Sequence, residues 1–312
     1  MGGQRMKIIF MGTPDFAVPS LEILFQNYDV LAVVSQPDKP KGRGKKMAFS
    51  PVKEKALQLG IEVLQPEKVR EIEFIEKLKT YHADLIVVTA FGQILPEEIL
   101  NMPKYGCINV HGSLLPKYRG AAPLQWSVIN GEKQTGVTTM YMAKGMDTGD
   151  MLLKQSIDIL PNDTYGSIHD KLSVIGAELL FKTIEELQKG TLQRIPQNEQ
   201  EASYAPMLTK QSGHIDWSKK CDEIICLIHG LDPVPTAYTM YHDDMIKIWQ
   251  AEKIEQPSGK IGEITAITKK GFVVTAGDGS IVITEVQAKG KKRMSADAYL
   301  RGHNIEIGTI LA

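Results

Sequence analysis

A polar pair closes one of the apolar stretches of this chain. Asn109 and His111 end the run GCINVHG at residues 106–112, and the sequence then breaks into SLLPKYRG. Residues two apart share one face of a strand, so an amide and an imidazole are predicted to emerge side by side. In an open α/β sheet, ligands bind at the carboxyl ends of the strands. The pair is either part of a ligand site or a strand end whose polar groups satisfy backbone atoms, and each residue alone favours the second interpretation.

A carboxylate farther along the chain favours the interpretation of this pair as part of a ligand site. Asp147 lies between Gly145 and Gly149 in the stretch GVTTMYMAKGMDTGDML at residues 136–152. Glycines in a loop allow the backbone to approach a ligand closely. An Asn, a His and an Asp in one crevice supply an oxyanion donor, a proton-transfer group and a partner for it. This set predicts acyl transfer without a covalent enzyme intermediate.

The elements that would position these residues alternate between strand and helix. This alternation predicts an α/β fold with a doubly wound, mostly parallel open sheet. A further pair of strands with a short connection is expected to be antiparallel, and a long amphipathic helix follows it at 164–189. The predicted strands are residues 6–12, 30–38, 61–66, 83–90, 106–112, 135–142 and 150–159.

The last third of the chain differs in pattern. Residues 262–288 alternate between apolar and polar positions, with turn signals at Lys270-Gly271 and Asp278-Gly279. Short strands of this kind predict a small C-terminal β-barrel, similar to an OB fold. We therefore expect a catalytic domain at 6–190, a linker at 191–212 and a β-barrel domain at 213–312.

Composition narrows the classes of function. The chain has 312 residues, a formal net charge of −1 and 43% hydrophobic residues, which is typical of a soluble protein of about two domains. A nucleic-acid partner must therefore be met by a local basic patch. The three cysteines show no pairing framework, and no apolar run is long enough for a membrane helix, so a cytoplasmic location is expected. The opening MGGQR is unlike structure, and Met6 is a candidate natural start.

Several common motifs are missing from the sequence. The first strand is followed by GTPDF and not by GxGxxG, so dinucleotide binding is not predicted. The sequence also has no HExxH, P-loop or GxSxG pattern, and no metal is implied.

The two polar stretches together resemble a known family. NVHGSLLPKYRGAAPLQW followed by GVTTMYMAKGMDTGDML is similar to the signature of the 10-formyltetrahydrofolate-dependent formyltransferases. FMGTPDFAVPSLE, QPDKPKGRGKK, LTKQSGHIDWSK and GLDPVPTAYT extend the similarity over nearly the whole chain, and the GRGKK and RGAAP runs narrow it to the branch that acts on methionyl-tRNA. The resemblance implies transfer of the formyl group of 10-formyltetrahydrofolate to the α-amine of charged initiator tRNA.

The resemblance also assigns roles to residues of this sequence. It implies that Asn109, His111 and Asp147 are catalytic and that a loop and a strand end contact the folate. For the strand end, VTAFGQIL at 88–95, a helix cap is an equally good interpretation. The folate-contacting residues implied are Ser113, Leu114, Leu115, Pro116, Phe91, Gln93 and Ile94.

Two basic stretches are candidates for contact with tRNA. A charge run is usually a solvated loop, but Gly42 and Gly44 would let the stretch 38–51 follow a phosphate backbone and order on binding. The resemblance implies that this loop engages the acceptor stem, and KGKKRMSADAYLR at 289–301 is a second candidate. The residues concerned are Lys41, Arg43, Lys45, Lys46, Lys291, Lys292 and Arg293.

One departure from the family pattern lies in HGLDPVP at 229–235. His229 and Val234 stand where relatives usually have an Arg and a Trp, so contacts made there with RNA or between domains are in question. Three alternatives stay open beside formylation of methionyl-tRNA by a monomer. These are formyl transfer to another amine, such as a purine precursor or an amino-sugar nucleotide, hydrolysis of the formyl folate, and a non-catalytic tRNA- or folate-binding role.

Overall fold

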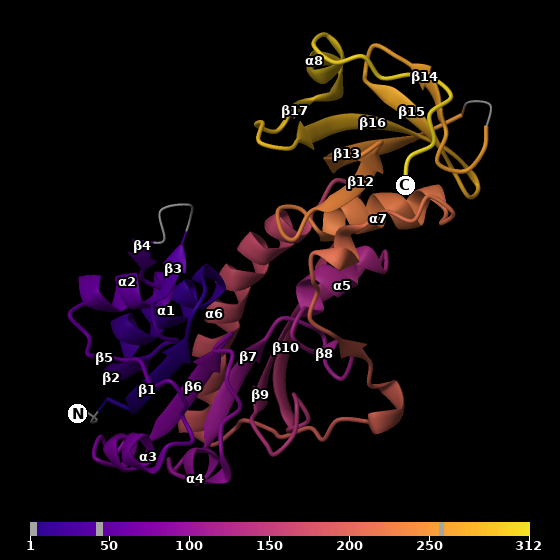
Figure 1. Cartoon of the computed structure of the whole chain (residues 1–312). Coiled ribbons are helices and arrows are strands. Elements are labelled where there is room, and N and C mark those ends of the chain that lie inside the picture. Colours follow the sequence, from indigo (N-terminus) through magenta and orange to yellow (C-terminus); the bar gives the residue numbers. More distant parts are fainter. Residues whose placement is uncertain (1–4, 42–45, 256–258) are drawn as a thin grey trace. The chain divides into compact units, whose positions relative to one another are not determined.

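The computed structural model describes residues 5–41, 46–255 and 259–312 (Figure 1). The chain forms two compact units, each assembled from more than one segment. The first unit contains Met1–Gly120, Gly136–Ile157 and His169–Tyr204, and the second contains Ala121–Thr135, Asp158–Ile168 and Ala205–Ala312. Two short segments that precede position 190 therefore belong to the second unit, which the local sequence pattern does not indicate.

The first unit is built on a seven-stranded sheet with the order β10-β9-β7-β6-β1-β2-β5. The pairs β1–β2, β1–β6, β2–β5 and β6–β7 are parallel, and β9 joins β7 antiparallel, so the predicted mostly parallel sheet is confirmed. The strands are β1 (Lys7–Gly12), β2 (Asp29–Val34), β5 (Val63–Leu64), β6 (Leu85–Thr89), β7 (Cys107–His111), β9 (Gln134–Tyr141) and β10 (Met151–Asp158).

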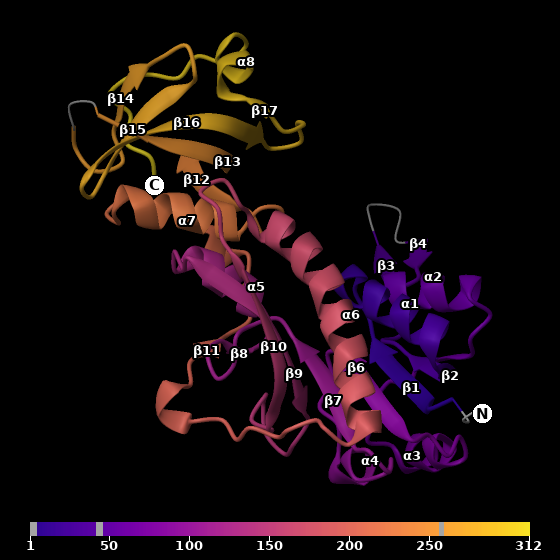
Figure 2. The ribbon, with the colours of Figure 1, turned by 180° about the vertical axis from the view of Figure 1, so that it is seen from behind.

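Helices cover both faces of this sheet. Ile108 and Val110 of β7 share an apolar cluster with Leu180 and Ile184 of α6, and Figure 2 shows this helix in front of β6 and β7. Cys107 belongs to the cluster on the other face, beneath α3 and α4. The helices of this unit are α1 (Val18–Asn27), α2 (Pro51–Gln58), α3 (Ile72–Lys79), α4 (Glu97–Leu100) and most of α6 (Tyr165–Lys189).

Short elements complete the first unit. The stretch predicted as a basic loop begins and ends in a two-stranded ladder, β3 (Lys39–Lys41) with β4 (Lys46–Ala48). Predicted strand 30–38 ends at Val34, because the polar residues that follow leave the sheet. The remaining short elements are 3₁₀ turns at Asp15–Ala17 and Glu199–Glu201 and the paired strands β8 (Arg119–Gly120) and β11 (Tyr204–Ala205).

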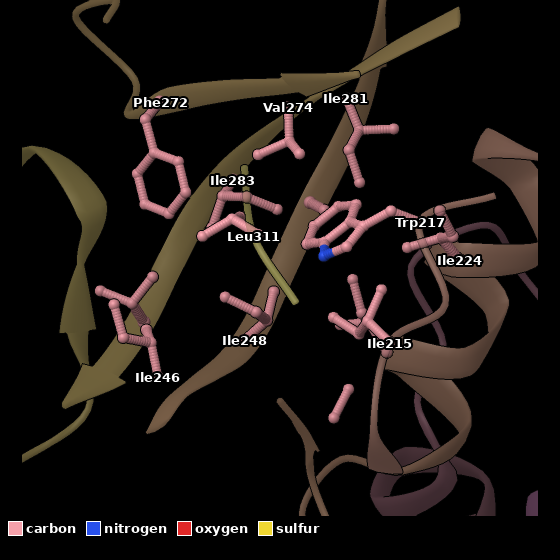
Figure 3. Close-up of a cluster of buried hydrophobic side chains, with 14 of the residues drawn as sticks. Ile215, Trp217, Ile224, Ile246, Ile248, Phe272, Val274, Ile281, Ile283 and Leu311 are labelled. Atoms are coloured by element: carbon pink, nitrogen blue, oxygen red, sulfur yellow. The ribbon is translucent and has the colours of Figure 1, made fainter. Parts of the chain in front are cut away.

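Where the sequence predicted a small β-barrel, the second unit contains an antiparallel sheet with the order β12-β13-β16-β15-β14 and β17 beside β16. Its core gathers Trp217, Phe272 and a set of Ile and Val side chains between the sheet and α7 (Figure 3). The elements are α5 (Pro123–Ile129), a 3₁₀ turn (Gln211–Gly213), α7 (Cys221–Gly230), β12 (Ala237–Tyr241), β13 (Asp244–Ile254), β14 (Ile264–Ile267), β15 (Phe272–Ala276), β16 (Gly279–Ala288), β17 (Met294–Ser295) and α8 (Ala296–Leu300).

Candidate active site

Asn109 and His111 lie at the carboxyl end of β7, as predicted. Alternation along the strand puts Ile108 and Val110 on the α6 face, so both polar side chains share the opposite face with Cys107. Asn109 is in register with Val88 of β6 and with Met140 of β9, which places it between two buried strands. Both polar side chains are buried. A buried amide and imidazole cost free energy unless other polar groups satisfy them, so their contacts identify the site.

The third predicted residue, Asp147, reaches this strand end from the connection between β9 and β10. Its Oδ2 lies 3.6 Å from Nδ1 of His111, which is ion-pair distance but too long for a hydrogen bond. The same Oδ2 accepts a hydrogen bond of 2.9 Å from the Gly120 amide. Among the described residues, no hydrogen bond reaches the other carboxylate oxygen, Oδ1. The three residues that the sequence singled out are therefore neighbours in space.

Both ring nitrogens of His111 face oxygen atoms of neighbouring residues. Nε2 lies 3.0 Å from the Tyr118 carbonyl oxygen, and Nδ1 faces the Asp147 carboxylate. Both neighbours can accept hydrogen bonds, so the ring is oriented between the Tyr118 carbonyl and the Asp147 carboxylate.

Asn109 differs from His111 in its contacts. Only 9% of the residue is exposed, yet within the described part of the chain its side-chain amide makes no hydrogen bond. The interpretation of Asn109 as a strand cap that satisfies backbone atoms therefore has no support. An NH₂ donor that no other group occupies is what a developing oxyanion requires.

A nucleophilic thiol is not part of this arrangement. Cys107 precedes Asn109 by two residues on the same face, and its Sγ donates to the Ile99 carbonyl. Burial raises the pKa of the Cys107 thiol to about 12. The thiolate is the reactive form, so Cys107 has the character of a packing residue.

Three residues that the sequence did not single out connect to the site. Gln197 donates from Nε2 to the carbonyl oxygens of Asp147 and Gly149, each at 2.8 Å. Arg119, in turn, binds Gln197 and Glu199. Arg119 lies inside the run KYRGAAP, but Gln197 and Glu199 fall in the stretch predicted to be a linker. Only tertiary structure brings these residues to Asp147.

The residues predicted to contact folate have different environments. Ser113, Leu115 and Pro116 are buried, Leu114 is partly exposed, and Ser113 donates to the Lys117 carbonyl. Phe91 is part of the apolar core, and the Gln93 side chain accepts a hydrogen bond from the Val69 amide. Ile94, by contrast, is exposed. It borders a hollow of about 350 Å³ lined by Ile94–Glu98, Leu100 and Ala143–Gly145.

This hollow adjoins the Asp147 loop in sequence, because Gly145 lines it two residues before Asp147. Its volume is within the usual range for small-ligand pockets. Ile94, Leu95 and Pro96 provide an apolar wall, and Lys144 pairs with Glu97 at 3.2 Å at its rim. The hollow has the size and the apolar wall to hold a flat, partly apolar ligand.

The predicted tRNA contacts fall into two groups. Lys41 and Lys46 end the strands of the β3–β4 ladder, while Arg43 and Lys45 lie outside the described residues. Lys291 and Lys292 are exposed in the second unit.

Arg293 differs from its two neighbours. Its guanidinium binds Glu285 at 2.6 Å and Asp232 at 3.2 Å, and it stacks on the Trp249 ring at 4.4 Å. Its charge is therefore largely neutralised within the unit.

The two residues predicted to depart from the family pattern, His229 and Val234, have different environments. His229 is near the end of α7, and burial lowers the pKa of its imidazole despite the nearby Asp232 carboxylate. A neutral imidazole at neutral pH cannot replace the cation of an arginine. Val234 is exposed.

The described residues contain no group of three or more His, Cys, Asp or Glu that could hold a metal ion. A search of the helices in residues 5–41, 46–255 and 259–312 found none with both the length and the apolar character needed to cross a membrane.

Comparison with known proteins finds a matching family model for each of the two parts of the chain. Residues 6–184 match the model of the formyl transferase family, and residues 207–304 match that of the formyl transferase C-terminal domain. The chain is 54% identical over 312 residues to the methionyl-tRNA formyltransferase of Caldanaerobacter subterraneus subsp. tengcongensis, covering 98% of this chain and 100% of the relative. It is 53% identical over 308 residues to that of Clostridioides difficile, with 98% and 100% covered.

Solved structures show the same fold at lower identity. The sugar 3N-formyl transferase WlaRD has a TM-score of 0.68 at 21% identity, over 93% of this chain and 100% of that one. HypX from Aquifex aeolicus, in complex with tetrahydrofolic acid, has a TM-score of 0.63 at 17% identity, over 98% of this chain and 51% of that one. At these identities the likeness shows the fold alone.

Proposed function

This chain belongs to the formyl transferase family, and from that premise we propose that it transfers the formyl group of 10-formyltetrahydrofolate to the α-amine of methionyl-tRNA. The acceptor is supported by relatives about half identical over nearly the whole chain, which carry that name. The observation that carries the chemistry is the uncommitted Asn109 amide beside the His111–Asp147 pair.

We assign Asn109 and His111 to the stabilisation of charge. As the amine attacks the formyl carbon, the formyl oxygen gains negative charge. The Asn109 NH₂ donates to that oxygen, and a charged His111 adds an electrostatic contribution from the same face of β7. Because both side chains are buried, water screens these interactions little. Preorganised donors of this kind usually make the largest contribution to acyl transfer.

We assign Asp147 to proton movement and to the charge of His111. Its Oδ2 is occupied by the Gly120 amide and faces His111, whereas Oδ1 has no partner among the described residues. Oδ1 can take a proton from the attacking amine and deliver it to the folate nitrogen as the bond from that nitrogen to the formyl carbon breaks. One N–C bond forms, one N–C bond breaks, and one proton moves between the two nitrogens.

The folate cosubstrate supplies the formyl group, and the hollow beside Ile94 is our candidate for its binding site. The apolar wall of Ile94–Pro96 suits a flat heterocycle, and the hollow runs to the loop that carries Asp147. We assign tRNA contact to the ends of the β3–β4 ladder and to Lys291 and Lys292. Because Arg293 is paired with two carboxylates, it is a weaker candidate than its neighbours.

The test is formylation of initiator and elongator methionyl-tRNA by the purified protein with 10-formyltetrahydrofolate. Formyl-methionyl product is expected on the initiator form. Asn109→Ala should lower kcat by about 10²–10³, the usual effect of losing one oxyanion donor. The matched control is Asn101→Ala at the exposed end of α4, which should leave kcat unchanged.

Three outcomes would contradict parts of this proposal. Product on an amino-sugar nucleotide but on neither tRNA would overturn the acceptor and leave the chemistry. Formate release without an acceptor would indicate a hydrolase. Near-normal turnover by Asn109→Ala would remove that amide from the mechanism.

A further inference from the structure

Arg119 is an unusual residue to find in a protein core. Its side chain is 0% exposed, and it is the largest fully buried side chain among the described residues. Two of its nitrogens bind the Glu199 carboxylate at 2.8 and 2.9 Å, and Nε donates to Oε1 of Gln197 at 3.0 Å. A buried guanidinium costs free energy unless other groups pair with it and accept its hydrogen bonds. Glu199 supplies the opposite charge, and Gln197 accepts the remaining hydrogen bond from Nε.

The guanidinium determines which way the Gln197 amide points. An arginine nitrogen can only donate, so the Gln197 atom that faces Nε must be the oxygen. The NH₂ group is then turned to the other side, where it donates to the carbonyl oxygens of Asp147 and Gly149. Arg119 thus holds the amide in the one orientation that lets Gln197 bind the 145–149 loop. We call these two hydrogen bonds from Gln197 the clamp.

That loop has a conformation that needs a clamp. Asp147 has a φ of +53°, in the left-handed region that residues other than glycine rarely adopt. Such a conformation persists only where the surroundings over-determine it. Gln197 holds the Asp147 backbone, and the Gly120 amide holds its carboxylate. Both constraints come from residues attached to Arg119, one through its side chain and one through the chain.

The same stretch also holds the imidazole. The carbonyl of Tyr118, the residue before Arg119, lies 3.0 Å from Nε2 of His111. The amides of Tyr118 and Arg119 bind Ser203 through its hydroxyl and its carbonyl, at 2.9 and 2.8 Å. Residues 118–120 therefore contact His111 and Asp147 and are tied to the segment 197–203.

We propose that Arg119 and Gln197 are positioning residues for formyl transfer, which fix the Asp147 carboxylate against His111 through the clamp on the 145–149 loop. This inference rests on the proposed function, in which Asp147 and His111 carry the chemistry. Neither residue contacts His111 or the Asp147 carboxylate directly through its side chain, so their action passes through the geometry of the loop.

The first test uses two substitutions of Gln197. Gln197→Met removes the clamp. Gln197→Glu keeps an oxygen for Arg119 Nε but turns its other oxygen toward two carbonyl oxygens, which it would repel. Both should lower kcat and kcat/KM together, by up to about 10²-fold, because displacement of a catalytic group by about 1 Å can cost that much. The matched control, Gln200→Met, changes an exposed glutamine three residues along and should leave kcat at the wild-type value.

A double-mutant cycle with Asp147→Asn separates positioning from general loss of stability. If Gln197 acts through Asp147, Gln197→Met should cost little further turnover once Asp147 has been changed. The inference would be overturned if the losses of turnover from the two single substitutions multiplied in the double variant, and if turnover fell in step with the thermal midpoint. So would wild-type kcat in both Gln197 variants when Asp147→Asn is impaired. Normal turnover by Asp147→Asn itself would instead overturn the role of Asp147 in the proposed function.

Discussion

Two arginines of this protein are held by carboxylates in opposite ways. In the first unit, the Arg119 side chain is 0% exposed, and its partner Glu199 is 69% exposed. In the second unit, the Arg293 side chain is 36% exposed, and its partner Asp232 is 10% exposed. One pair buries the cation and leaves the carboxylate in water, and the other buries the carboxylate.

The difference has a direct consequence for titration. The hydrogen bonds from Arg119 lower the pKa of the Glu199 carboxyl. Burial raises the pKa of the Asp232 carboxyl, and the attraction of Arg293 does not fully offset it. A guanidinium keeps its charge at any pH a protein tolerates, so burying it gives a fixed charge. Burying the carboxylate instead produces a group whose charge depends on pH.

The partners beyond the carboxylates differ as well. Arg119 also donates a hydrogen bond to Gln197, and the Gln197 amide in turn donates to the backbone carbonyl of Asp147. Arg293 stacks on Trp249 and binds Glu285, which are neighbours on the sheet of the second unit. We infer that the first arginine serves catalysis and the second serves local structure.

The largest effect expected from this comparison is on turnover. Arg119→Met should lower kcat by up to about 10²-fold, since the Gln197 amide loses the donor that orients it. Arg293→Met, the matched change in the other pair, should leave kcat within error. Steady-state formylation kinetics, with thermal midpoints measured in parallel, checks both. Equal losses in the two variants would abolish the distinction.

The sequence was sufficient for the fold and for the strand end that carries Asn109 and His111 because the signals there are local. Continuous apolar runs predicted the parallel strands of the first sheet, and turn pairs predicted the hairpins of the second. The i, i+2 spacing put Asn109 and His111 on one face of β7. The resemblance read from the motifs at 109–126 and 136–152 was confirmed by the family models and relatives.

The remainder of the site depends on contacts that no local pattern contains. Arg119 lies 78 residues from Gln197 and 80 residues from Glu199 in sequence, and no periodicity relates the three. Gln197 and Glu199 lie in a polar, proline-containing stretch whose composition is typical of a linker. Their role depends on Ser203 and Glu199 folding back onto the 118–120 segment, and only the tertiary structure contains that information. The domain bounds and the tRNA contacts stay predictions.

A smaller effect is expected on stability from the buried carboxylate. The pKa of Asp232 is raised in the folded protein above its ordinary value of 3.8, so the folded state binds more protons than the unfolded state above that pH. The stability that Asp232 contributes is therefore present below about pH 3.8 and is lost as pH rises through the folded pKa.

Asp232→Asn removes this dependence. The free energy of unfolding of the wild type, relative to this variant, should fall as pH rises from about 3.8 and level off above the folded pKa. Denaturant unfolding at a series of pH values measures the difference. Glu285 and His229 are present in both proteins, so their own contributions largely cancel when one value is subtracted from the other. A difference that grows with pH would show that Arg293 outweighs burial.

The smallest effect, of opposite sign, is expected from the exposed carboxylate. The pKa of Glu199 is lowered in the folded protein below its ordinary value of 4.5, so the unfolded state binds more protons in that interval. The stability from this pair is present above about pH 4.5 and is lost as pH falls through the folded pKa. Relative to Glu199→Gln, the wild type should therefore gain stability as pH rises to about 4.5 and stay level above it.

The slope should be shallow because water screens a carboxylate that is 69% exposed. The same denaturant series that tests Asp232 measures it, with Glu201→Gln in the same exposed turn as the matched control. A neutral glutamine can still accept one hydrogen bond from Arg119, so turnover by Glu199→Gln at neutral pH should fall less than turnover by Arg119→Met. If both variants lose turnover equally, the carboxylate and not the guanidinium orients Gln197. Arg119 would then serve only to bring Glu199 to the segment, and the asymmetry between the two arginine pairs would lose its functional meaning.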